Sequence, residues 1–245
     1  MAVRLVCLAH AGAGVSSFRQ WRQLSGGALE PRPWLLPGRD GRRREPRVTG
    51  RAALLDDMRA LLDDPPSGPY LLYGHSLGGM IAYTLARALH EAGAPLPALL
   101  AVGACPPPRA PLGLSGAADA PDEELVRLLD SFGAAPPGAV PGDLWHRKVL
   151  PVLRDDLRLA ADLRAAALIP SAAGPLPVPL LAVAGSEDVL ATAEDLAGWS
   201  RWTTGRFVRR TVPGGHFFVR DRELPRLIGR AARVLRRDGR LRTDG

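Results

Sequence analysis

The stretch YLLYGHSLGGMIAYTL, residues 70–85, decides the fold. Its start, Tyr70 to Tyr73, is an apolar run typical of a buried strand, and residues 77–90 have the pattern of a helix. Between them Gly74-His75-Ser76-Leu77-Gly78 matches G-x-S-x-G, in which a serine occupies a sharp strand-to-helix turn. The flanking glycines remove side chains that would collide there, so the serine hydroxyl is left exposed above the sheet. The pattern therefore predicts a nucleophile at Ser76.

The rest of the chain alternates between strand-like and helix-like segments. Strands are expected at residues 3–9, 33–36, 69–75, 98–104, 180–184 and 206–212, and helices at 16–25, 49–62, 77–90, 192–202 and 221–237. This alternation predicts an α/β fold with a mostly parallel, twisted sheet that is flanked by helices and joined by right-handed crossovers. The length of 245 residues fits a single α/β domain over residues 1–245.

Residues 105–175 interrupt this alternation. Their first part is rich in Pro, Ala and Gly, and two helices are expected after it, at 122–132 and 143–167. Pro151 is expected to kink or divide the second helix. Open α/β sheets bind ligands beyond the carboxyl ends of their strands. We therefore expect residues 105–175 to form a helical lid subdomain over that edge of the sheet.

A serine hydroxyl needs a base to become nucleophilic, and the base needs a carboxylate that orients it. Where a G-x-S-x-G elbow carries the serine, the acid and then the histidine follow it in the chain. His216 is the expected base, because it follows a strand and two glycines that let its loop reach over the sheet. Asp188, just after the strand at 180–184, is the expected acid, with Glu187 as the alternative. The end of the strand at 98–104 offers no carboxylate.

Acyl transfer also needs two backbone N–H donors for the oxyanion of the tetrahedral intermediate. We expect one donor from Leu77, which follows the serine, and the other from the loop His10-Ala11-Gly12-Ala13-Gly14. The same loop partly resembles a dinucleotide-binding turn, but Ser17 stands where that motif has its third glycine. The dinucleotide interpretation also leaves the serine, the acid and the histidine without a role. Acyl transfer through a seryl intermediate is therefore the better interpretation.

Composition argues against several other classes of protein. No run of about 18 apolar residues is present, so no membrane span is expected, and a strand that begins at Val3 leaves no room for a signal peptide. Cys7 and Cys105 lie in apolar runs without metal-ligand spacing, which predicts reduced thiols in a cytoplasmic protein with neither metal nor cofactor. The net charge is +7, nearly all the positive charge is arginine, and arginines cluster at 39–47 and 230–242. These clusters lack the interleaved aromatic residues of a nucleic-acid-binding surface.

Five stretches together resemble the type II thioesterases of polyketide and nonribosomal peptide biosynthesis, which are α/β-hydrolases. The stretches are LAHAGAGVSSFRQW (8–21), LLPGR (35–39), YGHSLGGMIAY (73–83), AGSEDVL (184–190) and PGGHFF (213–218). They span nearly the whole chain in the order of the family, and LPVLRDDLRLAADL (150–163) resembles its lid. The chain differs from the family at Ala9-His10, where Pro-Tyr is usual, and at Ala13, which is often Gly.

The resemblance implies a serine hydrolase that cleaves acyl thioesters from the phosphopantetheine arm of acyl or peptidyl carrier proteins, by way of a seryl acyl-enzyme. The residues alone support acyl transfer but do not select a thioester over an ester. Two alternatives stay open: a carboxylesterase or lipase that acts on free small esters, and a non-catalytic protein that binds carrier proteins. The arginine clusters would either attract an acidic carrier protein or be solvated surface.

The same resemblance implies roles for single residues. Ser76, Asp188 and His216 would be the nucleophile, the orienting acid and the base. The oxyanion would be bound by the N–H groups of Ala11 and Leu77. Substrate contacts are expected from His10, Phe132 and Phe217, with His146 as a further candidate. Leu125 and Leu129 are expected either to line an acyl chamber or to form the core of the lid.

Overall fold

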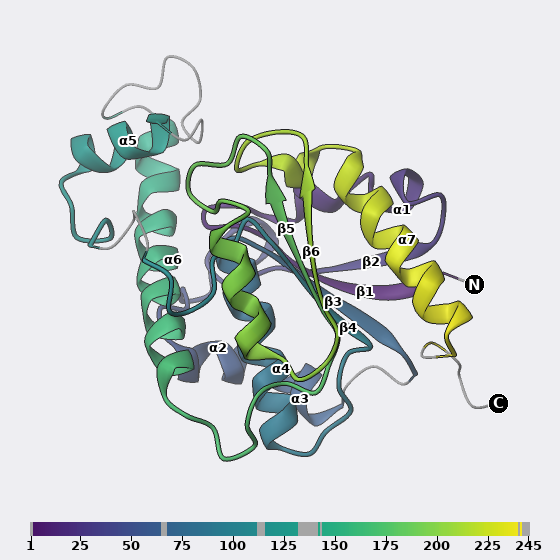
Figure 1. The fold of residues 1–245 in the computed structure, drawn as a ribbon. Coiled ribbons are helices and arrows are strands. Elements are labelled where there is room, and N and C mark those ends of the chain that lie inside the picture. The colour runs from purple at the N-terminus through teal and green to yellow at the C-terminus, as the bar shows by residue number, and fades with distance from the viewer. Residues whose placement is uncertain are drawn as a thin grey trace.

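A parallel sheet forms the centre of the molecule. The computed structural model describes residues 2–64, 68–111, 116–131, 142, 144–239 and 241. Within these ranges the strands pair in the order β2-β1-β3-β4-β5-β6, and all neighbouring strands are parallel (Figure 1). The strands are β1 (Val3–Leu8), β2 (Leu29–Trp34), β3 (Tyr70–His75), β4 (Leu99–Gly103), β5 (Leu180–Gly185) and β6 (Phe207–Val212). The parallel sheet expected from the sequence is confirmed.

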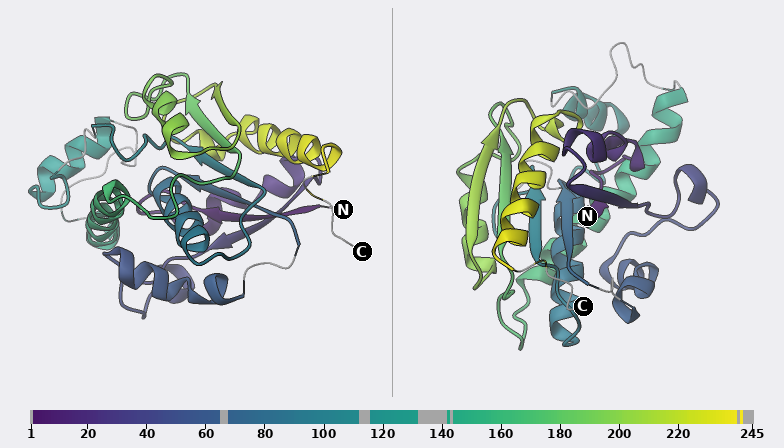
Figure 2. Two further views of the ribbon diagram at one scale, coloured as in Figure 1. Left: turned by 60° about the horizontal axis from the view of Figure 1, so that its bottom comes forward. Right: turned by 90° about the vertical axis from the view of Figure 1, so that its right-hand side faces the viewer.

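Helices cover both faces of this sheet. The α-helices are α1 (Trp21–Leu24), α2 (Arg51–Asp57), α3 (Arg59–Asp63), α4 (Leu77–Glu91), α5 (Asp122–Ser131), α6 (Leu144–Leu168) and α7 (Glu223–Arg237). The 3₁₀ helices are η1 (Val15–Phe18), η2 (Asp40–Arg42), η3 (Asp195–Trp202) and η4 (Phe218–Arg220). In Figure 2 the sheet separates α7 from α2 and α3. Every residue of β3, β4 and β5 is buried, as expected for strands whose two faces are both covered.

The position of β2 differs from the expectation. The strand was expected at residues 33–36 but spans Leu29–Trp34, where Leu29 is buried and pairs with Val3. Pro31 and Pro33 lie inside the strand. Proline is tolerated there because β2 is at the edge of the sheet, where a missing N–H does not interrupt a ladder. Because of these two prolines, the sequence pattern did not indicate that the edge strand begins at Leu29.

Several helices also differ from the expected ones. The helix expected at 49–62 is interrupted at the buried Met58, and the one expected at 192–202 is the 3₁₀ helix η3. Pro151 does not divide α6, which continues through it, with the proline on its exposed side. On α7, Ala232 is buried and Val234 is exposed. No helix in the part of the chain that the structure describes is long and apolar enough to cross a membrane.

Helices α5 and α6 lie at one side of the sheet (Figure 1). They share a small core of their own, formed by Ala117, Leu125, Leu129, Leu150 and Leu153. Farther along α6, Leu159 and Leu163 belong to the main core instead. Ala11, in the loop after β1, packs against both cores. This loop is therefore the place where α6 meets the carboxyl edge of the sheet.

Candidate active site

Ser76 stands at a strained turn between β3 and α4. Its backbone angles, φ 54° and ψ −117°, lie in a region that costs a non-glycine residue on the order of 1–3 kcal/mol. A Cβ atom on Gly74 would lie 1.8 Å from the Gly78 carbonyl oxygen, and one on Gly78 would lie 2.2 Å from that of Leu8. Both positions therefore require glycine. The N–H of Ser76 donates to the Gly103 carbonyl at 2.8 Å, which fixes the turn against β4.

The turn lies at the topological switch point of the sheet. From β1 the chain moves to β2 on one side, and it returns to β3 on the other side of β1. The loops that follow β1 and β3 therefore lie next to each other at the carboxyl edge, where open α/β sheets bind their ligands. This topology brings the loop at residues 10–14 beside Ser76.

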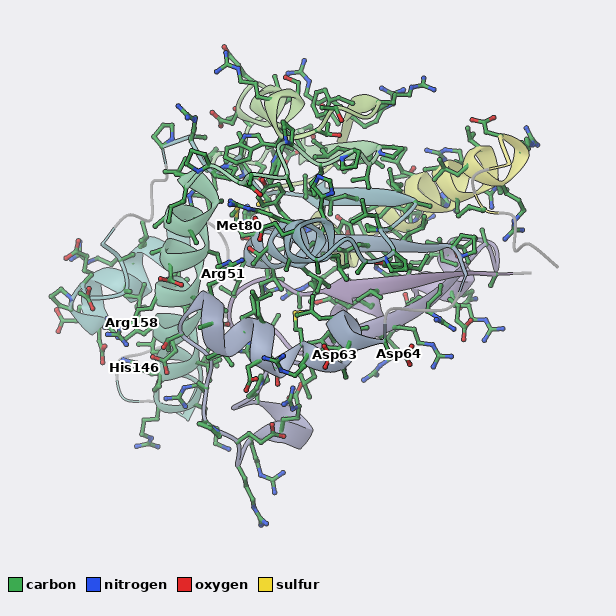
Figure 3. The ribbon with its side chains drawn as sticks, turned by 90° about the horizontal axis from the view of Figure 1, so that it is seen from below. Arg51, Asp63, Asp64, Met80, His146 and Arg158 are labelled. Carbon is green, nitrogen blue, oxygen red and sulfur yellow. The ribbon has the colours of Figure 1, made fainter. Side chains whose placement is uncertain are left out.

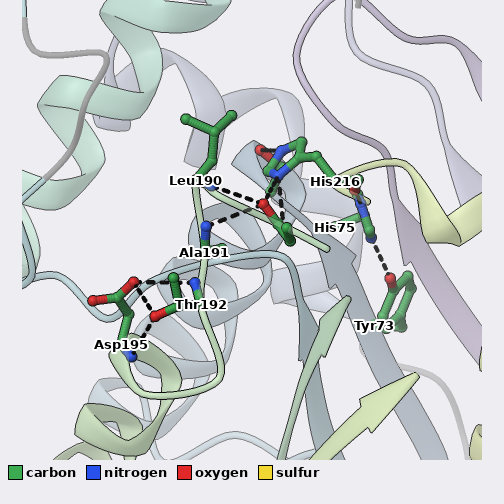
Figure 4. A network of polar contacts seen from close by, with 9 residues as sticks. Tyr73, His75, Leu190, Ala191, Thr192, Asp195 and His216 are labelled. Carbon is green, nitrogen blue, oxygen red and sulfur yellow. Dashed lines mark hydrogen bonds and ion pairs between the residues drawn. The ribbon is translucent and has the colours of Figure 1, made fainter. Parts of the chain in front are cut away.

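Three of the expected residues form one row of hydrogen bonds. The Ser76 hydroxyl lies 3.1 Å from His216 Nε2. His216 Nδ1 lies 3.0 Å from Asp188 Oδ2 and 3.1 Å from its Oδ1 (Figure 4). With a proton on Nδ1 that is donated to the carboxylate, Nε2 is free to accept the serine proton. The arrangement is chemically able to activate a hydroxyl for attack on a carbonyl.

The carboxylate of Asp188 is held rigidly after β5. Its side chain is fully buried, and Oδ1 also accepts the backbone N–H groups of Leu190 at 2.9 Å and Ala191 at 3.1 Å. The adjoining segment is fixed by Thr192 and Asp195, which exchange side-chain to backbone hydrogen bonds at the start of η3. Glu187, the alternative acid, is exposed. The structure thus brings Asp188, and not Glu187, to His216.

A buried imidazole supports the loop that carries His216. His75 Nε2 lies 2.7 Å from the His216 carbonyl oxygen, and His75 Nδ1 lies 2.7 Å from the Tyr73 hydroxyl (Figure 4). Burial holds the pKa of His75 well below its usual range, with the nearby histidines acting in the same direction. Sequence reasoning placed His75 only within the G-x-S-x-G match and missed this contact. The contact between Tyr73 and His75 had a signal in the sequence, because side chains two residues apart in a strand lie on the same face of the sheet.

The two expected oxyanion donors lie beside the serine. Ala11, Ser76 and Leu77 line the same cavity. Within the described residues, neither the Ala11 N–H nor the Leu77 N–H donates to another group. Two residues fix the Ala11 loop, Asp156 of α6 and Arg39. Sequence reasoning gave Asp156 no role and placed Arg39 in the arginine cluster at 39–47. Both belong to stretches that resemble the thioesterase family, but their pairing across the fold has no local signal.

The cavity beside Ser76 has a volume of about 490 Å³. One wall contains Met80 of α4, and the facing wall is formed by α6, which carries Arg158 (Figure 3). The α6 residues that line it recur at helical spacing: Leu157, Ala160, Ala161, Arg164, Ala165 and Leu168. Alanine and proline residues make up much of the remaining lining, so the cavity is wide and largely apolar.

None of the described residues that were expected to contact substrate lines the cavity. His10 is buried and packs its ring edge against Phe217, at 4.9 Å between ring centroids, and neither residue is among those that line the cavity. His146 of α6 bonds to Asp122 of α5, outside the cavity. Phe132 lies outside the described residues. Substrate contacts by His10, Phe132 and Phe217 stay predictions.

The environment of His10 is unusual for an imidazole. Its Nδ1 lies 2.9 Å from the Ala11 carbonyl oxygen, which only accepts, so the proton is on Nδ1. Nε2 is then a buried acceptor that has no partner among the described residues. Desolvation by burial lowers the pKa of His10 to about 4. The side chain is therefore neutral at pH 7.

Leu125 and Leu129 are core residues of the α5–α6 segment. Both are buried in the small core and are not among the residues that line the cavity. Of the two roles expected for them, the structure places them in core packing.

The arginine cluster at residues 39–47 is only partly a free cationic surface. Arg39 pairs with the buried Asp156, Arg42 with Glu45 and Asp57, and Arg47 with Asp155. Arg43 and Arg44 are exposed. Much of the positive charge in this cluster is thus neutralised within the fold.

The site offers no competing nucleophile or metal centre within the described ranges. No group of three or more His, Cys, Asp or Glu side chains there is placed to hold a metal ion. Cys105 lines the cavity, but burial raises its pKa to about 12, so the thiol stays protonated at pH 7. Ser76 is therefore the side chain in this cavity that is paired with a base.

Comparisons with known proteins agree with this geometry. A family model described as a thioesterase domain matches residues 3–234. Thioesterase PikA5 of Streptomyces venezuelae is 32% identical over 90% of this chain and 76% of its own length. The medium-chain S-acyl fatty acid synthase thioesterase of Homo sapiens is 28% identical over 92% of this chain and 84% of its own. RedJ, a thioesterase from the prodiginine biosynthetic pathway of Streptomyces coelicolor, superposes with a TM-score of 0.83 at 33% identity over 93% of this chain and 85% of RedJ. The expected α/β-hydrolase fold is confirmed by this likeness.

Proposed function

Because the chain belongs to the thioesterase family, we propose that it hydrolyses acyl thioesters carried on the phosphopantetheine arm of acyl or peptidyl carrier proteins. The observation that carries the proposal is the row of hydrogen bonds from Asp188 through His216 to Ser76, beside a largely apolar cavity. The relatives PikA5 and RedJ are named as thioesterases, and RedJ belongs to a prodiginine pathway. These names support a place in polyketide or nonribosomal peptide biosynthesis.

The first half of the reaction transfers the acyl group to the enzyme. His216 Nε2 takes the proton of Ser76 as Oγ attacks the thioester carbonyl carbon. The N–H groups of Ala11 and Leu77 bind the oxyanion, each contributing about 2.7–4 kcal/mol to stabilisation of the transition state. The C–S bond then breaks, and the pantetheine sulfur leaves with the proton that His216 returns. The product is an ester of Ser76.

The second half releases the acid. His216 takes a proton from water, whose oxygen attacks the ester carbonyl, and the Ser76 oxygen leaves with that proton. Asp188 stays ionised throughout and stabilises the imidazolium that forms in each half. The chemistry needs no cofactor, because the substrate itself carries the phosphopantetheine.

The cavity between α4 and α6 is the proposed acyl chamber. Its lining of alanine, proline, leucine and methionine side chains suits an apolar acyl chain. The described part of residues 105–175 then acts as a lid, because α6 and the segment at 104–111 supply most of the walls. An acyl chain on a carrier protein would be presented to this chamber in the cytoplasm.

The test compares one acyl group on two leaving groups. The wild-type enzyme should hydrolyse the acyl group from a holo carrier protein with a kcat/KM at least about tenfold above that for the same group on a small oxygen ester. Ser76→Ala should retain its fold and lose at least about 10³-fold in kcat. Ser200→Ala, at an exposed serine of η3, is the matched control and should behave as wild type.

Each alternative function has its own outcome in this test. Equal or faster turnover of the free ester would favour a general carboxylesterase. Folded wild-type protein whose Ser76 is not labelled by an alkyl fluorophosphonate would favour a non-catalytic carrier-binding protein. Mass spectrometry of the labelled peptide identifies the serine.

A further inference from the structure

Asp156 of α6 is a buried carboxylate that reaches the loop after β1. Its side chain is 1% exposed, and Oδ2 accepts the backbone N–H of Gly12 at 2.7 Å. Gly12 directly follows Ala11, whose own N–H points to no acceptor within the described residues. A carboxylate on α6 thus fixes the peptide next to the proposed oxyanion donor.

Arg39 completes this anchor from another part of the chain. Its guanidinium bonds to both carboxylate oxygens of Asp156, Nη1 to Oδ2 at 2.8 Å and Nη2 to Oδ1 at 2.6 Å. Nη1 also donates to the Ala13 carbonyl at 3.3 Å. The ion pair therefore holds the loop through two backbone groups. Asp156 accepts the Gly12 N–H, and Arg39 donates to the Ala13 carbonyl.

The loop depends on these contacts for its shape. Gly12 has φ +74°, a backbone angle that residues with a side chain rarely adopt. Inside the loop, the Ala13 N–H donates to the His10 carbonyl at 3.1 Å and His10 Nδ1 to the Ala11 carbonyl at 2.9 Å. A short turn of this kind has few contacts of its own to fix the direction of the Ala11 N–H. The additional constraints come from Asp156 and Arg39.

We propose that Asp156 is a positioning residue for hydrolysis: from α6 it holds the His10–Gly14 loop so that the Ala11 N–H faces the oxyanion. The proposal rests on the proposed function. It also makes the position of α6 part of the chemistry, because a shift of α6 away from the sheet would remove the acceptor of the Gly12 N–H. Oxyanion stabilisation then requires α6 to be seated on the loop.

A purely structural role for the ion pair makes a different prediction. Buried ion pairs are often replaced by apolar residues of similar volume without loss of stability, whereas removal of one partner is strongly destabilising. An apolar pair would restore the packing but has no acceptor for the Gly12 N–H. Stability and activity are therefore separable at this position.

The experiment uses Asp156→Asn and the double variant Arg39→Met/Asp156→Leu in the full chain. The readouts are Tm, kcat and KM with an activated acyl ester, and affinity for an acyl trifluoromethyl ketone. The serine oxygen adds to the carbonyl of this ketone, and the ketone oxygen becomes an oxyanion. The corresponding acyl amide forms no such adduct. We expect Asp156→Asn to lower kcat by about 10–100-fold with little change in KM. The amide places an NH2 group where a carboxylate oxygen accepts from Arg39, so the ion pair is lost, the loop shifts and one oxyanion donor is displaced. The double variant should recover the Tm but not kcat. In Asp156→Asn, affinity should fall for the ketone and stay unchanged for the amide.

Asp162→Asn is the matched control. Asp162 lies on the same helix and also accepts a backbone N–H, that of Arg51 at 2.6 Å, but it ties α6 to α2 instead of the oxyanion loop. Its replacement should lower the Tm without changing kcat by more than about twofold. A fall in kcat for this control as large as that for Asp156→Asn would overturn the proposal.

Recovery of wild-type kcat together with the Tm in the double variant would likewise overturn it. So would equal loss of affinity for the ketone and the amide in Asp156→Asn. These readouts use no carrier protein, so they are independent of the proposed substrate. If wild-type enzyme turned over the ester but not a carrier-bound thioester, the proposed function would fail while Asp156 was still tested.

Discussion

The imidazole Nε2 of His75 lies 2.7 Å from the backbone carbonyl oxygen of His216. A carbonyl oxygen only accepts, so the proton is on Nε2, and His75 Nδ1 must accept from the Tyr73 hydroxyl at 2.7 Å. Two residues of β3 thus fix the main chain of the residue whose side chain faces Ser76. The nucleophile and its base are held by the same strand.

Replacing Tyr73 by Phe tests this support. The change leaves His75 Nδ1 buried without a donor, which should lower the free energy of unfolding by about 1–3 kcal/mol. Because His75 still donates to His216, kcat should fall by less than about tenfold. Urea unfolding and steady-state kinetics measure the two effects. Tyr70→Phe is the control: its hydroxyl donates to the Pro95 carbonyl at 3.2 Å, away from His216, so kcat should be unchanged. Unchanged stability in Tyr73→Phe would contradict the buried hydrogen bond.

Replacing Asp188 by Asn tests the orienting acid. An amide in this position favours the wrong tautomer of His216, because it presents an N–H to Nδ1, and kcat should fall by about 10⁴-fold. Glu187→Gln, at the exposed neighbour, is the matched control and should keep wild-type activity. Acyl-ester hydrolysis measures both. Near wild-type activity of Asp188→Asn would show that the acid is another residue.

The low pKa of His10 predicts a loss of stability in mild acid. The pKa is about 4 in the folded protein against an ordinary value of 6.5, so below pH 6.5 the unfolded chain takes up a proton that the folded protein does not. The free energy of unfolding should therefore fall between pH 6.5 and pH 4, by up to about 3 kcal/mol from this residue. The low pKa of His75 acts in the same direction.

His10→Phe isolates this contribution. The ring retains its edge contact with Phe217 but no longer titrates, so the fall in stability from pH 6.5 to 4 should be smaller than in the wild type. Urea midpoints at a series of pH values measure it. The comparison at pH 8 is the control, because there the two proteins differ by packing alone. Equal slopes in both proteins would contradict the buried, neutral His10.

The sequence allowed the main site residues to be predicted because each lies close behind a segment that the sequence indicates is a strand. Ser76 follows β3, Asp188 follows β5 and His216 follows β6. The carboxyl ends of parallel strands meet at one edge, so strand order and side-chain chemistry were sufficient to bring the three residues together. The same reasoning predicted that the loop after β1 lies at this edge, and the family resemblance indicated Ala11 within it.

Contacts that depend on the packing of helices were not predictable in this way. Asp156 and Arg39 are separated by 117 positions and meet only because α6 crosses the loop after β1. No periodicity in either segment specifies that crossing. The edge strand β2 was misplaced for a related reason, since Pro31 and Pro33 are acceptable only at a sheet edge, and edge position is a property of the whole sheet.

Arg164 joins two of the segments that line the cavity. This buried residue of α6 donates to the carbonyls of Pro106 at 3.2 Å and of Pro107 and Pro108 at 3.1 Å, which ties α6 to the segment after β4 that also lines the cavity. A larger side chain on α6 should therefore fill the cavity and not push its walls apart. Ala161 faces the cavity and is exposed, so its enlargement costs little stability.

Ala161→Leu should consequently shorten the acyl chains that the enzyme accepts. We expect kcat/KM to fall by about tenfold or more for chains that reach Ala161, and to stay near the wild-type value for an acetyl group, because a poorly fitting methylene costs about 1–3 kcal/mol in an apolar pocket. Turnover of a series of acyl thioesters of increasing length measures the profile. Ala53→Leu, at an exposed alanine of α2, is the matched control and should leave the profile unchanged. If both variants showed the wild-type chain-length profile, the acyl chain would have to bind outside the cavity between α4 and α6.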